Sequence, residues 1–342
     1  MKRSFSILLT LVVVAFAIGL SNCGNDSHTP ALTKQFAFVQ PPAATAAMTA
    51  TERHFAMENP GMFRTLRGQT AAAVGPKSWA NGLKQGSDSV VLMNNDGSGQ
   101  PVVFSQVGWV DAVQEGYDGK TGVACLLDNN GVDYQIVSVD LRDQKNPKVT
   151  QITTGSGDRW SPQISWDGNK VVFVKFITKE GGRAMLMNTT GGAETEISTP
   201  FNVSTPSFLK DGRILFEQED NDSISVMNAD GSGFKQLTNP THVYFDEYPS
   251  VSPDGKTIVF ARYKADESTG EDIWTANIDG TNVKQLTTDG RSWDPMFVND
   301  KIVFLSERDT KSTSDVYSMN QDGSSPKRLT NDSVSEYFDN WW

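Results

Sequence analysis

The sequence predicts an all-β protein, a six-bladed β-propeller whose blades are four-stranded antiparallel sheets. Three observations lead to this fold class. A unit of about 45 residues recurs along the chain after residue 90. Each half of the unit has alternating β-branched and aromatic residues around a turn, usually Asp-Gly, a pattern typical of a β-hairpin. No helical periodicity of 3.6 residues accompanies the repeat, which excludes a solenoid of helices. Two hairpins per unit give four strands, the content of one propeller blade.

The first hairpin of each unit, strands a and b, is clearest at Ser252, where the chain reads SPDGKTIVFARY. The Asp-Gly pair tolerates the positive φ angles of a tight hairpin turn. The other copies read SWDGNKVVFVKF from Ser165, LKDGRILFEQ from Leu209, VNDKIVFLSE from Val298 and, more weakly, GYDGKTGVACLL from Gly116. The turn aspartates are separated by 49, 44, 43 and 46 residues, and they are Asp118, Asp167, Asp211, Asp254 and Asp300.

The second hairpin, strands c and d, occurs six times and therefore sets the number of blades. Asp96 and Asp322, the turn aspartates of the first and last copies, are five steps apart, which gives the step of about 45 residues. The six copies begin at Val90, Ile136, Met185, Ile224, Ile273 and Val316.

These units resemble the TolB-type, WD40-like propeller repeat, whose consensus is close to residues 252–287. The resemblance covers roughly residues 90–342 and implies a six-bladed ring. Departures lie in the turns, where Asp300 lacks its glycine, Gly191-Gly192 replaces Asp-Gly, and residues 140–143 replace it in the second blade. The resemblance also implies a protein-binding role, because TolB binds a peptidoglycan-associated lipoprotein in the envelope. TolB carries an extra N-terminal α/β domain, for which residues 24–90 are too few, so the fold and the protein-binding habit carry over without the specific partner.

Ring closure is predicted from both ends of the chain. The first clear element is already a c–d hairpin, and residues 34–40 fit the strand b that must precede it. Strand a of this first blade is missing from the N-terminal side. The segment from Glu336 to Trp342 follows the last strand d and sits where a further strand a would fall. We therefore expect the C-terminal strand to close the ring and remove its open edges.

Residues 1–22 are predicted to be an export signal. Lys2 and Arg3 precede an apolar run from Ile7 to Leu20, which is too short to span a bilayer comfortably. The segment that ends at Cys23 reads Leu-Ser-Asn-Cys and resembles a bacterial lipobox, so Cys23 is predicted to be lipidated as the mature N-terminus, with residues 23–34 as a polar tether. Asn22 departs from the small residue that the lipobox prefers. Ordinary cleavage after the Ala-Ile-Gly triplet at 17–19 is the alternative, and it would release a secreted soluble protein.

Composition excludes several classes of function. The net charge is −11, which argues against nucleic acid or an anionic membrane surface as the main partner. Three His and two Cys make a zinc cluster or a disulfide framework implausible. Cys125 lies in an apolar run and is interpreted as a buried structural thiol. Neither a Gly-x-Ser-x-Gly elbow nor a phosphate-binding loop occurs, and His242 is the single candidate base near the loops. We therefore expect a non-enzyme without cofactors.

The propeller, residues 35–342, is expected to bind through one face. The a–b and c–d turns, short and mostly Asp-Gly, form one face, while the b–c and d–a loops form the other, which we call the loop face. Its b–c loops include 175–183, 264–272 and 308–315, and the insertion at about 41–88, with a short helix over 45–58, also enters there. Binding residues usually lie on such loops. The partner-binding candidates in the d–a loops are Trp109, Asp111, Asp158, Arg159, Trp160, Asp246, Glu247, Tyr248, Arg291, Trp293, Asp294 and Asp339.

Alternatives remain open for these candidates. The aromatic residues suit protein or glycan recognition, but a residue at a fixed place in each blade also suits packing between blades. The acids would supply oxygen ligands to a Ca²⁺ ion in the channel, although solvated loop charge is the more usual explanation. The sequence thus predicts an exported, lipid-anchored envelope protein that binds other envelope proteins without catalysis. A glycan-binding or glycan-cleaving surface protein is the runner-up, and a purely structural envelope component is a third reading.

Overall fold

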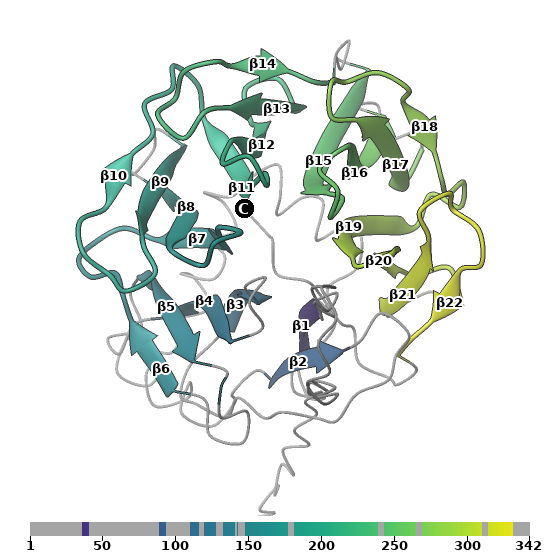
Figure 1. The fold of residues 1–342 in the computed structure, drawn as a ribbon. Helices are drawn as coiled ribbons and strands as arrows, with labels where there is room; N and C mark the ends of the chain where they lie inside the picture. The colour runs from purple at the N-terminus through teal and green to yellow at the C-terminus, as the bar shows by residue number, and fades with distance from the viewer. Residues whose placement is uncertain are drawn as a thin grey trace, which may run out of the picture.

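The computed structural model describes residues 36–40, 89–93, 110–115, 120–127, 133–140, 142, 148–176, 181–238, 243–264, 269–309 and 314–330. These residues form 22 strands, which build five four-stranded sheets and one two-stranded sheet, all antiparallel. The sheets are arranged like blades around a central axis (Figure 1). The predicted all-β propeller is confirmed, with five complete blades and part of a sixth. In the part of the chain that the structure describes, no helix is long and apolar enough to cross a membrane.

The blades are numbered in chain order. Blade 1 contains β1 (Phe36–Gln40) and β2 (Ser89–Met93). Blade 2 contains β3 (Val110–Glu115), β4 (Thr121–Leu127), β5 (Tyr134–Asp140) and β6 (Lys148–Gln151). Blade 3 contains β7 (Arg159–Ile164), β8 (Lys170–Phe176), β9 (Gly182–Asn188) and β10 (Thr195–Glu196). Blade 4 contains β11 (Val203–Phe208), β12 (Ile214–Gln218), β13 (Ser223–Met227) and β14 (Lys235–Gln236). Blade 5 contains β15 (Tyr244–Val251), β16 (Thr257–Lys264), β17 (Asp272–Asn277) and β18 (Lys284–Gln285). Blade 6 contains β19 (Ser292–Val298), β20 (Lys301–Ser306), β21 (Asp315–Asn320) and β22 (Lys327–Arg328).

Strands follow one another from the axis outward in every complete blade, as in the order β7-β8-β9-β10. In blade 1, β1 pairs with β2 from Phe36 opposite Met93 to Gln40 opposite Ser89. The predicted pairing of residues 34–40 with the strand near Val90 is therefore confirmed. The signal segment, the tether, the insertion at 41–88 with its helix, and the C-terminal strand at 336–342 lie outside the described residues.

The a–b turns differ in one respect from the expectation. In the turn from Ser252, Gly255 alone takes a positive φ, of 74°, while Asp254 does not. The Asp254 carboxylate instead accepts hydrogen bonds from the Ser252 hydroxyl (2.7 Å) and the Lys256 amide (3.0 Å). Aspartate at these turns is thus a side-chain acceptor that holds the turn, and glycine supplies the left-handed backbone. Where blade 6 lacks the glycine, Asn299 takes the positive φ of 56°.

A bulge interrupts the innermost strand of blades 3 to 6. Each bulge combines a residue of positive φ, the proline that follows it, and a shift in register against strand b. The four pairs are Ser161-Pro162, Thr205-Pro206, Tyr248-Pro249 and Asp294-Pro295. Because strand pairing resumes before each bulge, β7, β15 and β19 begin at Arg159, Tyr244 and Ser292. The segments expected to be d–a loops are therefore largely strand, which corrects the predicted boundaries.

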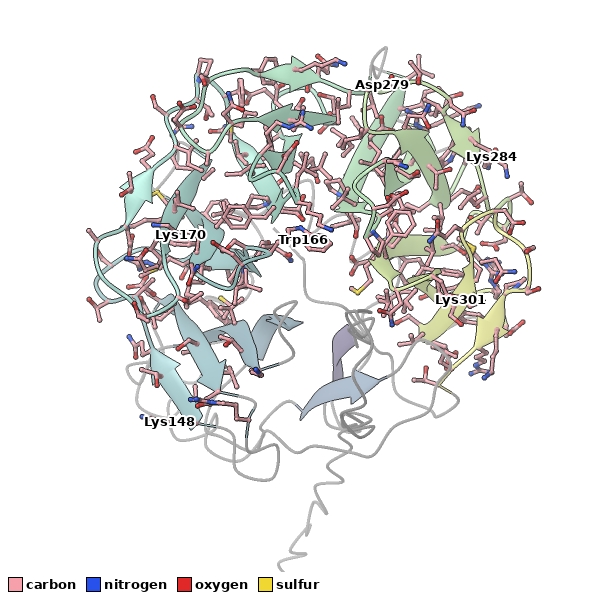
Figure 2. The ribbon with its side chains drawn as sticks, in the orientation of Figure 1. Lys148, Trp166, Lys170, Asp279, Lys284 and Lys301 are labelled. Carbon is pink, nitrogen blue, oxygen red and sulfur yellow. The ribbon has the colours of Figure 1, made fainter. Side chains whose placement is uncertain are left out.

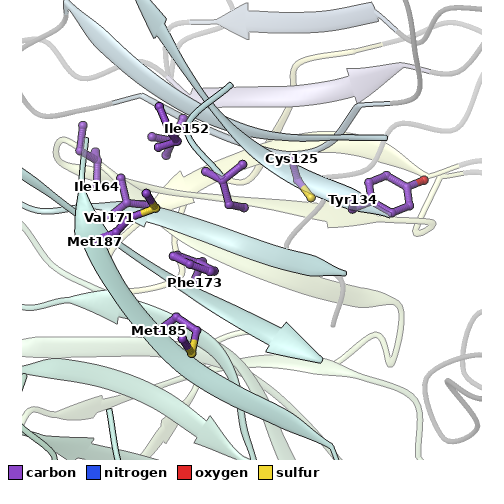
Figure 3. Close-up of a cluster of buried hydrophobic side chains, with 10 residues drawn as sticks. Cys125, Tyr134, Ile152, Ile164, Val171, Phe173, Met185 and Met187 are labelled. Atoms are coloured by element: carbon purple, nitrogen blue, oxygen red, sulfur yellow. The ribbon is translucent and has the colours of Figure 1, made fainter. Parts of the chain in front are cut away.

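The hydrophobic core lies at the seams between consecutive blades. Blades 2 and 3, for example, bury Cys125, Ile136, Phe173 and Met185 against one another (Figure 3). Cys125 is fully buried, as predicted for a structural thiol. Each of the four further buried clusters likewise joins two neighbouring blades. Among the described residues, seam packing therefore holds blades 2 to 6 together.

Hydrogen bonds reinforce the seams on the turn side of the ring. The Trp166 indole Nε1 of blade 3 donates to the Phe208 carbonyl of blade 4 (3.1 Å). At the periphery, Lys284 Nζ of blade 5 donates to the Asp322 carbonyl of blade 6 (3.1 Å). Figure 2 shows Trp166 toward the axis and Lys284 at the rim. Side chains of the repeat thus link neighbouring blades both near the axis and at the rim.

Candidate binding face

The loop face is the side of the ring where strands b lead to c and strands d lead to the next a. The predicted b–c loops are confirmed in position: β8 ends at Phe176 and β9 begins at Gly182, and β16 ends at Lys264 before β17 begins at Asp272. Residues 177–180, 265–268 and 310–313, inside three of these loops, lie outside the described residues.

Most of the predicted partner-binding residues lie beneath the surface of this face. Arg291 is exposed and Trp160 is half-buried. Asp111 lies on β3, while Trp109 and Asp339 fall outside the described residues. The buried set consists of Asp158, Arg159, Asp246, Glu247, Tyr248, Trp293 and Asp294. Their contacts explain what each side chain does in the fold.

Arg159 supports a d–a loop from within. It is 1% exposed, and its guanidinium donates to the carbonyls of Thr154 (3.0 Å), Gly155 (3.2 Å) and Gly157 (2.7 Å). Its charge is balanced by Glu194, whose carboxylate lies 2.7 Å from the guanidinium. Arg159 therefore fixes the path of residues 154–157 and turns no donor toward a partner.

Asp246 and Arg262 form a second internal pair. Asp246 is fully buried, and its two oxygens accept from Arg262 Nε (2.5 Å) and a terminal guanidinium nitrogen (2.8 Å). The guanidinium also lies over the rings of Tyr244, Phe260 and Trp274, with its centre 5.0–5.3 Å from each centroid. This paired, stacked arrangement anchors β15 to β16 at the loop face.

The two tryptophans pack within the ring. Trp293 is 6% exposed and belongs to a buried cluster with Tyr248 between blades 5 and 6. Trp160 packs against the cluster between blades 2 and 3, and its ring centroid lies 4.1 Å from that of Tyr134. Their neighbour Asp158 accepts a hydrogen bond from the Tyr134 amide (3.0 Å). These contacts agree with the packing role that the sequence left open for the aromatic residues.

Carboxyl groups gather at the loop-face end of the seam between blades 4 and 5. Glu217 of β12 and Glu247 of β15 are the central pair, and Glu219, Asp222 and Glu271 lie on the b–c loops beside them. Burial, followed by repulsion from Glu247, raises the pKa of Glu217 well above its usual value. Burial, followed by repulsion from Glu271, does the same to the pKa of Glu247, and the Tyr263 hydroxyl that donates to Glu247 (3.0 Å) opposes it. Burial raises the pKa of Glu219 to about 7.

Sequence reasoning included Glu247 in the candidate face but missed Glu217, Glu219, Asp222 and Glu271. The available signal was the acidic run that begins in the last two residues of β12 and reads Glu-Gln-Glu-Asp from 217 to 220. Such runs are usually solvated, and only the ring places this one against another blade. Among the described residues, no group of three or more His, Cys, Asp or Glu is arranged to hold a metal ion. His242 lies outside those residues.

Several side chains of the loop face do reach the surface. Val243, immediately before β15, is 46% exposed, and Asp220 in the β12–β13 loop is also exposed. Thr288, Asp289 and Arg291 form an exposed stretch before β19. These residues, rather than the buried candidates beneath them, are the described side chains that a partner would touch first.

Comparison with known proteins adds a sequence match to part of the chain. No protein-family model matches. Tol-Pal system protein TolB of Rhizorhabdus wittichii is 40% identical over 78 residues, 22% of this chain and 17% of its own length. The same-named protein of Zymomonas mobilis is 39% identical over 77 residues, 21% of this chain and 16% of its own length. The chain thus matches about one sixth of the length of these curated relatives.

Solved structures extend the likeness to the ring. TolB from Acinetobacter baumannii has a TM-score of 0.60 at 17% identity, over 73% of this chain and 61% of that one. The chain is a TolB-like β-propeller. A putative TolB from Agrobacterium tumefaciens gives 0.56 at 20% identity, over 69% of this chain and 85% of that one. At these identities the structural likeness shows the fold alone.

The TolB-like propeller also resembles rings found in enzymes. Oligogalacturonate lyase from Vibrio parahaemolyticus has a TM-score of 0.52 at 16% identity, over 72% of both chains. Puromycin hydrolase has a TM-score of 0.52 at 10% identity, over 72% of this chain and 43% of that one. The fold by itself therefore does not separate a binding protein from an enzyme.

Proposed function

We propose that this TolB-like propeller is an exported, lipid-anchored protein of the cell envelope that binds another envelope protein through its loop face. The observation that carries the proposal is the combined likeness to TolB, in sequence over 78 residues and in fold over most of the chain. The relatives are named as components of the Tol-Pal system, which supports an envelope protein as the partner class. Cys23 after the apolar N-terminal segment supports export with a lipid anchor.

We infer binding rather than catalysis because the sequence match is to TolB, whereas the matches to enzymes are of fold alone. The exposed residues of the loop face would make the contact, and the buried candidates beneath them would hold the loops in shape. Two ion pairs beneath the surface support these loops: Asp246 with Arg262, and Arg159 with Glu194. Asp111 on β3 extends the proposed face to blade 2, while Trp109 and Asp339 stay predicted members of it.

Affinity capture from solubilised envelopes tests the proposal. The loop-face variant combines Val243→Asp with Arg291→Glu, and the matched turn-face variant combines Val283→Asp with Lys256→Glu. All four side chains are exposed, so both variants should melt at the wild-type temperature. We expect mass spectrometry to show an envelope protein that the wild type and the turn-face variant retain and that the loop-face variant loses. Equal retention by both variants would contradict the assigned face.

Glycan recognition is the second candidate, and likeness to the fold of oligogalacturonate lyase is the observation that favours it. The same three proteins would be passed over immobilised polysaccharides. Retention that depends on the loop face, without capture of a protein, would favour a glycan ligand. Release of unsaturated sugar products by the wild type would indicate a lyase.

A further inference from the structure

The seam between blades 4 and 5 buries a carboxyl oxygen without a donor. Glu247 is 8% exposed, and its Oε1 accepts from the Tyr263 hydroxyl (3.0 Å). Its Oε2 is buried and has no hydrogen-bond partner among the described residues. A charge on a carboxylate oxygen in such a place would carry a large desolvation cost. A proton on the group removes most of that cost.

More than half of the titratable groups around Glu217 and Glu247 are carboxyls. Glu217 comes from β12, which packs against β15, and Glu271 precedes β17. The remaining groups are Glu219 and Asp222 of the β12–β13 loop, Asp246 and Tyr248 of β15 itself, Tyr263 and Arg262 of β16, Asp294 of β19, and Arg183 of β9 beside Glu219.

Both guanidinium groups in this set have partners elsewhere. Arg262 is bound to Asp246 by two hydrogen bonds. Arg183 donates to the Asn202 side chain (2.7 Å) and lies 4.0 Å from Glu196. The repulsion between Glu217 and Glu247 is therefore relieved most directly by a proton, as in other sites where two carboxyls share one location.

We propose that Glu217 and Glu247 retain a shared proton at neutral pH, and that its loss loosens the loop-face end of the seam between blades 4 and 5. A backbone hydrogen bond between the two blades would weaken when the carboxyls lose the proton. The Asp246 amide of blade 5 donates to the Asp222 carbonyl of blade 4 (3.1 Å), so one hydrogen bond spans this end of the seam. Ionisation of the cluster places like charges on its two sides and pushes the β12–β13 loop away from β15.

The direction of the pH effect follows from proton linkage. The pKa values of Glu217 and Glu247 are raised in the folded protein, so the folded state binds more protons than the unfolded state above about pH 4.5. The free energy of unfolding therefore decreases as the pH rises from that point. A substitution that makes Glu217 or Glu247 permanently neutral should therefore make the free energy of unfolding decrease less as the pH rises.

Thermal unfolding from pH 5 to pH 8.5 tests the proposal on Glu217→Gln and Glu247→Gln, with Asp300→Asn in the exposed a–b turn of blade 6 as control. The wild type and the control should melt several degrees lower at pH 8.5 than at pH 5. Each glutamine variant in the cluster should show a smaller decrease and a higher melting temperature than wild type at pH 8.5. A curve parallel to that of wild type, displaced downward at every pH, would show a structural role only and overturn the proposal.

Hydrogen exchange on the unmodified protein gives a second measurement that requires no variant. After correction for the intrinsic exchange rate, protection of the Asp246 amide should decrease at least tenfold between pH 6 and pH 8.5. The amide of Phe176 at the loop-face end of blade 3, which donates to the Asp158 carbonyl (3.0 Å), should change less. Unchanged protection at Asp246 would overturn the proposal. Neither measurement involves a partner, so their outcome is independent of the proposed binding function.

Discussion

Asp246 and Arg262 show how single residues hold the loop face in shape. The aspartate is fully buried, and the arginine side chain is 13% exposed among three aromatic rings. Because both charges have left water, each depends on the other. The pair is thus a structural requirement of β15 and β16, and it supports the exposed Val243 immediately before β15.

Asp246→Ala should lower the free energy of unfolding by about 3–5 kcal/mol, because it leaves the Arg262 charge buried without its carboxylate. Urea denaturation at pH 7 measures the change. The double variant Asp246→Ala with Arg262→Met removes both charges and should recover a large part of the loss. A cost below about 1 kcal/mol for Asp246→Ala would mean that water already balances the charge.

The residue scale is also where sequence reasoning reached its limit. The pattern of aromatic and acidic residues before each strand a was visible, but the sequence did not tell whether they face solvent. Trp293 lies on β19 and is buried because it packs against Tyr248 and Ala261 of the neighbouring blade. Glu217 joined the carboxyl cluster only because β12 of one blade packs against β15 of the next. Such contacts form between neighbouring blades, so the sequence of a single repeat does not indicate them.

In several blades, a threonine that follows strand d accepts a hydrogen bond from a backbone amide of strand c. In blade 5 the Thr287 hydroxyl accepts from the Ile273 amide (2.9 Å) and donates to Asp272 (2.8 Å). Blades 2, 4 and 6 repeat the bond to the strand c amide through Thr153, Thr238 and Thr330. This bond explains why the threonine follows strand d at the same place in these units.

Thr287→Val should destabilise the protein by about 1–3 kcal/mol, since it leaves the buried Ile273 amide and the Asp272 carboxyl without this partner. Thr288→Val is the matched control, because Thr288 is adjacent and exposed. Chemical denaturation of the two variants gives the comparison. Equal midpoints for Thr287→Val and wild type would show that water replaces the hydroxyl.

The c–d turns predict an acid-side pH effect of opposite sign to that of the glutamate cluster. In the last turn, hydrogen bonds from the Ser324 hydroxyl and amide lower the pKa of Asp322, and Thr281 does the same for Asp279. A lowered folded-state pKa contributes stability above the unfolded value of about 3.8, which is lost as the pH falls below it.

Ser324→Ala should therefore raise the pKa of Asp322 toward its ordinary value and leave that of Asp279 unchanged as an internal control. Carbon-detected NMR titration of the two carboxyls measures both in one sample. The variant should also lose less stability than wild type on acidification from pH 4 to pH 2.5. If both aspartates shift together, the side-chain hydrogen bond is not the main cause.

At the element scale, the hairpins and their spacing could be predicted, while the bulges were missed. Four prolines, such as Pro249, stand five residues before the turn aspartate and could have marked the bulges. The residue before proline normally avoids a left-handed conformation, so nothing in local preference predicts φ of 54° at Tyr248. In the structure, strand a pairs with strand b on both sides of this bulge.

At the scale of the whole molecule, the period of the repeat was sufficient to predict the ring. Its length gave four strands per unit, and its six copies gave the number of blades. The structure confirms the order of strands in five complete blades and the β1–β2 pair of another. Location and anchoring rest instead on the N-terminal segment, which lies outside the described residues.

Cys23→Ser tests the proposed anchor in cells. The lipid is attached to the cysteine side chain, so Cys23→Ser should be lost from the membrane fraction. Cys125→Ala should remain in that fraction, because Cys125 is a buried core residue. Fractionation with immunodetection and metabolic labelling by a fatty-acid analogue measure both proteins. Persistence of labelled Cys23→Ser in the membrane would contradict lipidation at Cys23.

Site-specific photo-crosslinking in intact cells tests most directly the central claim, that this TolB-like propeller binds an envelope protein through its loop face. A photoreactive phenylalanine would replace Val243 or Thr288 on the loop face, and Val283 or Asp211 on the turn face. The account predicts one crosslinked envelope protein, shared by the two loop-face positions and absent from the two turn-face positions. Crosslinking from the turn-face positions alone, or to no protein from any position, would contradict it.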